Sequence, residues 1–291
     1  MKFHDAAARV RRLISRIRSE GSASSIATPE VPEASKDRFL IFSLPRSGSS
    51  TLRDILQCHP QVRCAFEPFN SDTDLGKIYA RGIVNRATLE AALSELWKKH
   101  NGIKHVWNRF GYPFEKSPDK QLLNHHLLEV CNAKVIFLKR RNALKRIVSD
   151  ELSHQSRVWR SSAGARKAHL RYDFRPLDIK RIQSSLRQEF EALASYRESL
   201  VYRRVPFIDL WYEDLYGEEE SLKTGPAKIR EIISFLGLSQ FEERNWARVM
   251  ALLDPLQTKV NSRETYLRIP NIDEVERVLG SEETGWLFRR V

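Results

Sequence analysis

The stretch from Phe39 to Asn70 holds most of the side chains whose types and spacing suit chemistry on an anion. An apolar run, Phe39–Leu44, precedes the loop PRSGSST, and leucine and isoleucine then recur at helical spacing. The first turn of a helix has unpaired backbone N–H groups and partial positive charge, and small residues let a phosphate approach them. Arg46 adds a permanent cation. The loop is completed by Ser47, Gly48, Ser49, Ser50 and Thr51. We therefore predict a strand, an anion-binding loop and a helix; the alternative is an ordinary serine-rich turn.

The loop differs from the phosphate-binding loop of nucleoside triphosphatases. That motif is GxxxxGK followed by serine or threonine. Here no glycine stands at the required distance before Gly48, and Ser49 occupies the position of the lysine. The missing lysine disfavours ATP or GTP hydrolysis.

Three segments in this stretch, PRSGSSTL, HPQV and FEPFN, resemble the 5′-phosphosulfate-binding region of sulfotransferases that use 3′-phosphoadenosine 5′-phosphosulfate (PAPS). The RSGSS form followed by FEP is most similar to carbohydrate sulfotransferases, including bacterial ones. The resemblance implies PAPS as the donor, 3′-phosphoadenosine 5′-phosphate (PAP) as the product, and a hydroxyl of a saccharide or glycolipid as the acceptor. It also implies that Glu67 is the catalytic base that removes the acceptor proton. Arg46 and the loop are then expected to stabilise the charge on the sulfuryl oxygens and the leaving 5′-phosphate. A glutamate that only orders its loop is the alternative.

A second segment extends the resemblance. The apolar run Lys134–Lys139 is followed by Arg141 and, eight residues later, by Ser149. In the family an arginine and a serine with this spacing hold the 3′-phosphate of the donor. The proline that often follows the arginine pair is replaced by Ala143, which removes no ligand. A solvated basic helix is the alternative, because lysine and arginine crowd here. The resemblance covers residues 38–160 well and residues 205–237 loosely.

The run from Gly102 to Trp107 is predicted to be another strand. Small-molecule sulfotransferases carry Lys-x-His in this region, with the histidine as base. In this chain Lys104 and His105 are adjacent, so the spacing departs from that pattern. His105 remains our alternative base, and Lys104 is expected either to contact the sulfuryl group or to face solvent. Lys259 and Arg263 are candidates for a late basic loop near the 3′-phosphate, although the family's usual Arg-Lys-Gly triplet is absent.

Strand and helix patterns alternate at least four times, which predicts an α/β fold with a mostly parallel, P-loop-like sheet flanked by helices. We expect this sulfotransferase-like domain to span residues 37–291. Residues 1–36 are predicted to form a basic helix at 3–18, which packs on the domain or lies on an anionic membrane, and a flexible linker at 19–36.

Composition points to an anionic partner. The 291 residues carry a net charge of +12, and the isoelectric point is about 9.7. No nucleic-acid-binding motif accompanies this charge, so we predict no nucleic-acid partner.

Three cysteines in no paired spacing fit a reducing compartment, and the histidines lack the spacing of a metal site. No apolar run reaches membrane-spanning length, and we expect a cytoplasmic enzyme, with peripheral membrane contact through residues 3–18 as an option. The alternative functions are a P-loop-type nucleotide or sugar kinase and a non-catalytic basic module that binds nucleic acid or membrane.

Overall fold

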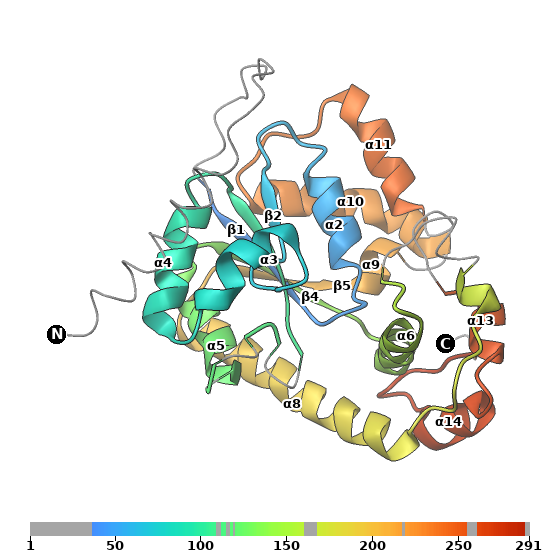
Figure 1. Ribbon diagram of the computed structural model, residues 1–291. Coiled ribbons are helices and arrows are strands. Elements are labelled where there is room, and N and C mark those ends of the chain that lie inside the picture. Colours follow the sequence, from blue (N-terminus) through green and yellow to red (C-terminus); the bar gives the residue numbers. More distant parts are fainter. Residues whose placement is uncertain are drawn as a thin grey trace, which may run out of the picture.

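A five-stranded sheet forms the centre of the molecule (Figure 1). The computed structural model describes residues 37–108, 112–114, 117–118, 120–159, 168–216, 219–254 and 261–288. All strands of the sheet are parallel, in the order β2-β3-β1-β4-β5. They are β1 (Phe39–Ser43), β2 (Cys64–Phe66), β3 (Gly102–Val106), β4 (Lys134–Lys139) and β5 (Phe207–Trp211). The predicted α/β class with a parallel sheet is confirmed. The helix and linker predicted for residues 1–36, and Lys259, lie outside the described residues.

Helices connect the strands and cover the sheet. They are α2 (Ser49–Leu56), α3 (Asp74–Tyr79), α4 (Arg86–Leu96), α5 (Lys120–Val130), α6 (Ala143–Ser156), α8 (Ile179–Tyr202), α9 (Tyr212–Tyr216), α10 (Glu219–Phe235), α11 (Glu243–Leu253), α13 (Arg263–Leu267) and α14 (Ile272–Leu279). A 3₁₀ turn, η1, follows α3 at Ala80–Gly82, and residues 168–171 form one further helical turn. Within the described residues no helix is both long and apolar enough to cross a bilayer.

The two faces of the sheet carry different hydrophobic clusters, because successive side chains of a strand point to opposite faces. In β1, Phe39 and Ile41 belong to the cluster under α2, α10 and α11, whereas Leu40 and Phe42 belong to the cluster under α4, α5 and the end of α8. Figure 1 shows these two helix layers on either side of the strands. Every residue of β1 is buried, as expected for a strand covered on both faces.

A third hydrophobic cluster joins α6 and α14 to the first half of α8. The long helix α8 therefore packs against two clusters: Ile182 and Leu186 lie in the third, and Tyr196 and Leu200 lie under the sheet. This arrangement holds α6 at the carboxyl ends of β1 and β4. The loops that follow those two strands meet there, which is where parallel α/β sheets bind their ligands.

Candidate active site

The loop between β1 and α2 has the backbone of an anion site. Gly48 precedes α2 with φ of 81° and provides no side-chain cap to the first turn, which also lacks an acidic residue. A Cβ at this position would lie 2.8 Å from the ring of Tyr216 and 2.9 Å from that of Tyr212, so only glycine fits. The buried hydroxyl of Ser47 has no hydrogen-bond partner among the described residues. Unsatisfied donors at a helix N-terminus suit an oxyanion.

Two arginines hold this loop from behind. Arg146 Nη1 donates to the carbonyl oxygen of Pro45 at 3.3 Å, and Arg140 Nη1 donates to that of Arg46 at 3.1 Å. Arg146 is fully buried in α6 and forms an ion pair with Glu189 of α8. The carbonyl oxygens at 45 and 46, which would repel an anion, are thus occupied by arginines.

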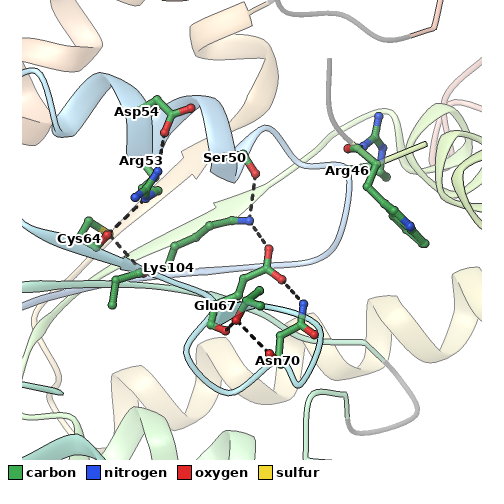
Figure 2. Close-up of polar contacts among 11 residues, drawn as sticks. Arg46, Ser50, Arg53, Asp54, Cys64, Glu67, Asn70 and Lys104 are labelled. Atoms are coloured by element: carbon green, nitrogen blue, oxygen red, sulfur yellow. Dashed lines mark hydrogen bonds and ion pairs between the residues drawn. The ribbon is translucent and has the colours of Figure 1, made fainter. Parts of the chain in front are cut away.

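A buried ion pair lies beside the start of α2 (Figure 2). Lys104 of β3 pairs with Glu67, which directly follows β2, and its Nζ donates to Ser50 Oγ at 3.0 Å. The register of the sheet explains the pairing: Phe66 lies opposite Lys104, and the Glu67 amide continues the ladder by donating to the Lys104 carbonyl at 3.0 Å. Asn70 Nδ2 donates to Glu67 Oε2 at 2.7 Å. One carboxylate, one ammonium and one hydroxyl of the anion loop are therefore in contact.

The electrostatics of this cluster keep Glu67 ionised. Burial alone raises the pKa of Glu67, but the charge of Lys104 and the hydrogen bonds from Lys104 and Asn70 outweigh it, so that the pKa is below its usual 4.5. The backbone of Glu67 is left-handed, with φ of 41°, an uncommon conformation for a non-glycine residue. Such strained residues concentrate at functional sites. Glu67 is a carboxylate that can accept a proton at neutral pH.

His105 lies on the opposite face of β3 from Lys104. It is buried between the rings of Phe42 and Phe114, at centroid distances of 5.4 and 5.6 Å, and Nε2 lies 2.7 Å from Asn124 Oδ1. Burial lowers its pKa to about 4. Adjacent residues of a strand point to opposite faces of the sheet, so His105 lies away from the face on which Lys104 pairs with Glu67, and its ring packs in the aromatic core. Lys104, for which a solvent-facing position was an option, is instead only 2% exposed.

Arg46 does not lie at the Glu67 end of the loop. Figure 2 shows its side chain apart from the Glu67–Lys104 contacts. Arg46 Nε donates to Ser149 Oγ at 3.1 Å, and Nη1 donates to the Trp159 carbonyl at 2.6 Å. Both acceptors are neutral. Burial lowers the pKa of Arg46, but an arginine stays charged in proteins. Arg46 was expected to stabilise charge on the sulfuryl group, whereas the cation that contacts Glu67 is Lys104.

Arg141 and Ser149 are not in direct contact in the described hydrogen bonds. Arg141 Nη2 pairs with Asp214 at 2.8 Å and its side chain is half exposed. Glu213 accepts hydrogen bonds from the Arg141 and Asn142 amides, at 2.9 and 3.1 Å, at the start of α6. The two acids of the YEDL segment thus hold the start of α6 and the side chain of Arg141. Arg141 therefore has a carboxylate partner, whereas Ser149 has Arg46.

The remaining candidates are dispersed. Ser49 is buried at the first turn of α2. The guanidinium of Arg263 lies 5.8 Å from the centroid of the Phe288 ring. No group of three or more potential metal ligands occurs in the described part of the chain. Asn70 was missed from the sequence, although it stands three residues after Glu67, the spacing of one tight turn.

Comparison with known proteins gives a family match and two similar solved structures. Residues 38–243 match the sulfotransferase family. No curated protein sequence matches the chain. Two solved structures are similar: mouse sulfotransferase SULT7A1 complexed with PAP and the sulfotransferase domain of the Synechococcus olefin synthase. The first is 15% identical with a TM-score of 0.42, and the match covers 79% of this chain and 70% of that one. The second is 16% identical with a TM-score of 0.37, and the match covers 86% of each chain.

The family match spans most of the chain and includes both halves of the site, the loop after β1 with Glu67 and Lys104, and the segment after β4 with Ser149. The chain therefore belongs to the sulfotransferase family.

Proposed function

We propose that this protein transfers a sulfuryl group from PAPS to a hydroxyl of a carbohydrate or glycolipid acceptor, with Glu67 as the base. The contact of Glu67, Lys104 and Ser50 at the start of α2 carries the proposal. It combines an ionised carboxylate, a buried cation and an anion-binding helix end within one cluster.

The residues present fit the donor. Gly48 forms a cradle that a Cβ would fill, and Ser47 has a buried hydroxyl without a partner in the described residues. These groups, with Ser49, Ser50 and Thr51, would hold the 5′-phosphosulfate. Arg46, Arg141 and Ser149 would hold the 3′-phosphate end. PAPS, when bound, supplies a sulfuryl group on a 5′-phosphate that leaves as PAP.

Glu67 then acts on the acceptor. Its carboxylate accepts the hydroxyl proton as the acceptor oxygen attacks sulfur, which is general base catalysis. Lys104 and the amides at the start of α2 stabilise negative charge on the sulfuryl and phosphate oxygens. The buried ammonium is fixed by Ser50 and Glu67 before the reaction, so little reorganisation is needed. Asn70 fixes the other carboxylate oxygen.

An open cavity beside Phe66 supports a polar acceptor. Its volume is about 610 Å³, and its lining includes Arg53, Arg63, Phe66, Asp72 and Lys99. An aromatic ring with carboxylates and cations suits a sugar that carries hydroxyl and acidic groups. Thr73 also lines the cavity, and its hydroxyl donates to the backbone carbonyl of Glu67 at 2.9 Å, so the cavity lies next to the loop that carries the proposed base. Sulfation assays with acidic and with neutral polysaccharides would test this part of the proposal.

The donor is tested by calorimetric titration of the full chain with PAP, with AMP and with ATP–Mg²⁺. We expect PAP to bind without metal, AMP to bind more weakly because it lacks the 3′-phosphate, and Arg141→Ala to weaken PAP binding. A preference for ATP–Mg²⁺ would overturn the proposal in favour of a kinase. Salt-sensitive binding of nucleic acid or vesicles, with no PAP binding, would favour the non-catalytic alternative.

A further inference from the structure

Five polar side chains form a continuous chain behind the loop that follows β1. Arg46 Nε donates to Ser149 Oγ at 3.1 Å, and Asn261 Nδ2 donates to the same oxygen at 2.9 Å. Asn261 Oδ1 lies 2.7 Å from His169 Nδ1, and His169 Nε2 lies 2.6 Å from Ser156 Oγ. The chain joins the middle of α6, at Ser149, and its carboxyl end, at Ser156, to residues 169 and 261, which are distant in sequence.

Two members of this chain are inaccessible to water, and the other three are partly buried. His169 is completely buried and Ser149 is 4% exposed. Buried polar atoms in native proteins are almost always hydrogen-bonded, so these partners fix one another's orientation. His169 acts on Ser149 only through Asn261. Its Nδ1–H donates to Asn261 Oδ1, and its Nε2 then accepts the hydroxyl hydrogen of Ser156, for which the Leu152 carbonyl at 2.8 Å is a second acceptor.

The bonds at Ser149 leave one hydrogen-bonding group unused. A hydroxyl has two acceptor lone pairs and one hydrogen. Arg46 and Asn261 both donate to Ser149 Oγ and use the two lone pairs. The hydroxyl hydrogen has no acceptor among the described residues, although Arg46 brings a positive charge beside it. A hydroxyl held in this way can only donate, and it suits an anionic oxygen.

We propose that Asn261 and His169 are positioning residues for the 3′-phosphate of the donor. Asn261 holds Ser149 so that its hydrogen is presented to the phosphate, and His169 holds the amide of Asn261 in the orientation that this requires. The inference rests on the proposed function, because that function supplies the phosphate. It assigns a role in donor recognition to the segment before α13 through a neutral side chain rather than through the basic residues Lys259 and Arg263.

The test is a pair of calorimetric titrations, with PAP and with AMP, of the full chain and of Asn261→Ala and Asn261→Asp. Without Asn261 the Ser149 hydroxyl is no longer oriented to the phosphate, and the loss of that hydrogen bond to a charged group predicts PAP binding weakened about tenfold or more, with AMP binding changed less than about twofold. Asn261→Asp should be the weaker binder, since its carboxylate accepts the Ser149 hydrogen and repels phosphate. A purely structural contact would weaken both nucleotides equally, and that result, or unchanged PAP binding, overturns the inference.

Two further variants keep the result interpretable if Asn261 variants fold poorly. His169→Asn retains a group near the position of Nδ1 and should keep more of the PAP-to-AMP preference than His169→Ala. Ser153→Ala is the matched control, because Ser153 is buried on the same helix and donates to the Ser149 carbonyl, not to its hydroxyl. An equal preference for PAP over AMP in the two His169 variants contradicts the inference. So does a loss of PAP affinity in Ser153→Ala as large as in Asn261→Ala.

If the unsubstituted protein does not bind PAP, the proposed function itself fails. If it binds PAP and Asn261→Ala keeps the same preference for PAP over AMP, only the positioning role is rejected.

Discussion

The two ends of the site differ in how their cations are compensated. Lys104 is paired with the carboxylate of Glu67, whereas the described hydrogen bonds of Arg46 go to neutral oxygens, the Ser149 hydroxyl and the Trp159 carbonyl. Lys104 is buried and Arg46 is partly buried, beside the same loop. The first end is therefore a charge-balanced acid–base pair, and the second is a cation whose hydrogen bonds go to a hydroxyl and a carbonyl, with Asp150 as a carboxylate that attracts it without a direct contact.

This difference suggests that the Glu67 end takes part in the reaction and that the Arg46 end binds the nucleotide. A carboxylate kept ionised by a lysine is suited to accept a proton, and its partner is suited to bear charge in the transition state. A cation whose hydrogen bonds go to neutral groups is suited to bind an anion in the ground state. Substitutions at the Glu67 end should therefore change the rate of sulfuryl transfer, and those at the Arg46 end should change the affinity for the nucleotide.

The largest effect is expected from Glu67→Gln. The amide cannot take the acceptor proton, so the rate of sulfuryl transfer should fall by about 10²- to 10⁴-fold, the usual contribution of a general base. PAP affinity, measured by calorimetry, should stay within about threefold of the native value, because Glu67 is proposed to act on the acceptor and not on the nucleotide. A threefold change corresponds to less than about 0.7 kcal/mol of binding free energy. A variant that keeps its activity would show that Glu67 only orders the loop.

Lys104→Met should reduce the rate by a smaller factor and should change its pH dependence. In the native protein Lys104 holds the pKa of Glu67 below 4.5, so the carboxylate is ionised and the rate is steady down to that region. Without Lys104, burial dominates and raises the pKa, and the acid limb of kcat/KM should move to higher pH. Thermal melts of the variant control for lost stability, since removing one partner of a buried ion pair is costly. An unmoved acid limb would mean that Glu67 is not the titrating base.

At the other end, Arg46→Ala and Ser149→Ala should each weaken PAP binding by about tenfold to a hundredfold, the range for a hydrogen bond to a charged group. Because the two side chains are bonded to each other, the double variant should lose less than the product of the single losses. Calorimetry on all four proteins gives this coupling. Strict additivity would show that the Arg46–Ser149 contact has no part in binding.

The smallest effect on the rate is expected from His105→Gln. Its ring lies in the aromatic core, so we expect a loss of about 1–3 kcal/mol in the free energy of unfolding, the cost of disturbing a buried polar contact. At a temperature where the variant is folded, kcat should remain within about threefold of native, in contrast to the loss in Glu67→Gln. A loss of activity that matches Glu67→Gln would return His105 to the role of base.

Local sequence determined the elements and the anion loop. The strands at 39–43 and 134–139 and the helix that starts at Ser49 follow from apolar runs, helical periodicity and a glycine between small polar residues. Each of these signals lies within a short stretch of chain. The same holds for the proposal of Glu67 as the base, which rests on its FEP motif.

Only the tertiary structure decided that Lys104 lies at the Glu67 end of the site and Arg46 at the Ser149 end. Lys104 meets Glu67 because β2 and β3 are neighbours in a register that places Phe66 opposite Lys104, and no local pattern specifies the partners of a parallel strand. His105 is excluded from that cluster by the alternation of side chains on the same strand. Ser149 gains Arg46 and Asn261 because α6 packs behind the loop, across separations of 103 and 112 residues. Contacts at such separations depend on how the elements pack, which the sequence specifies only through the fold as a whole.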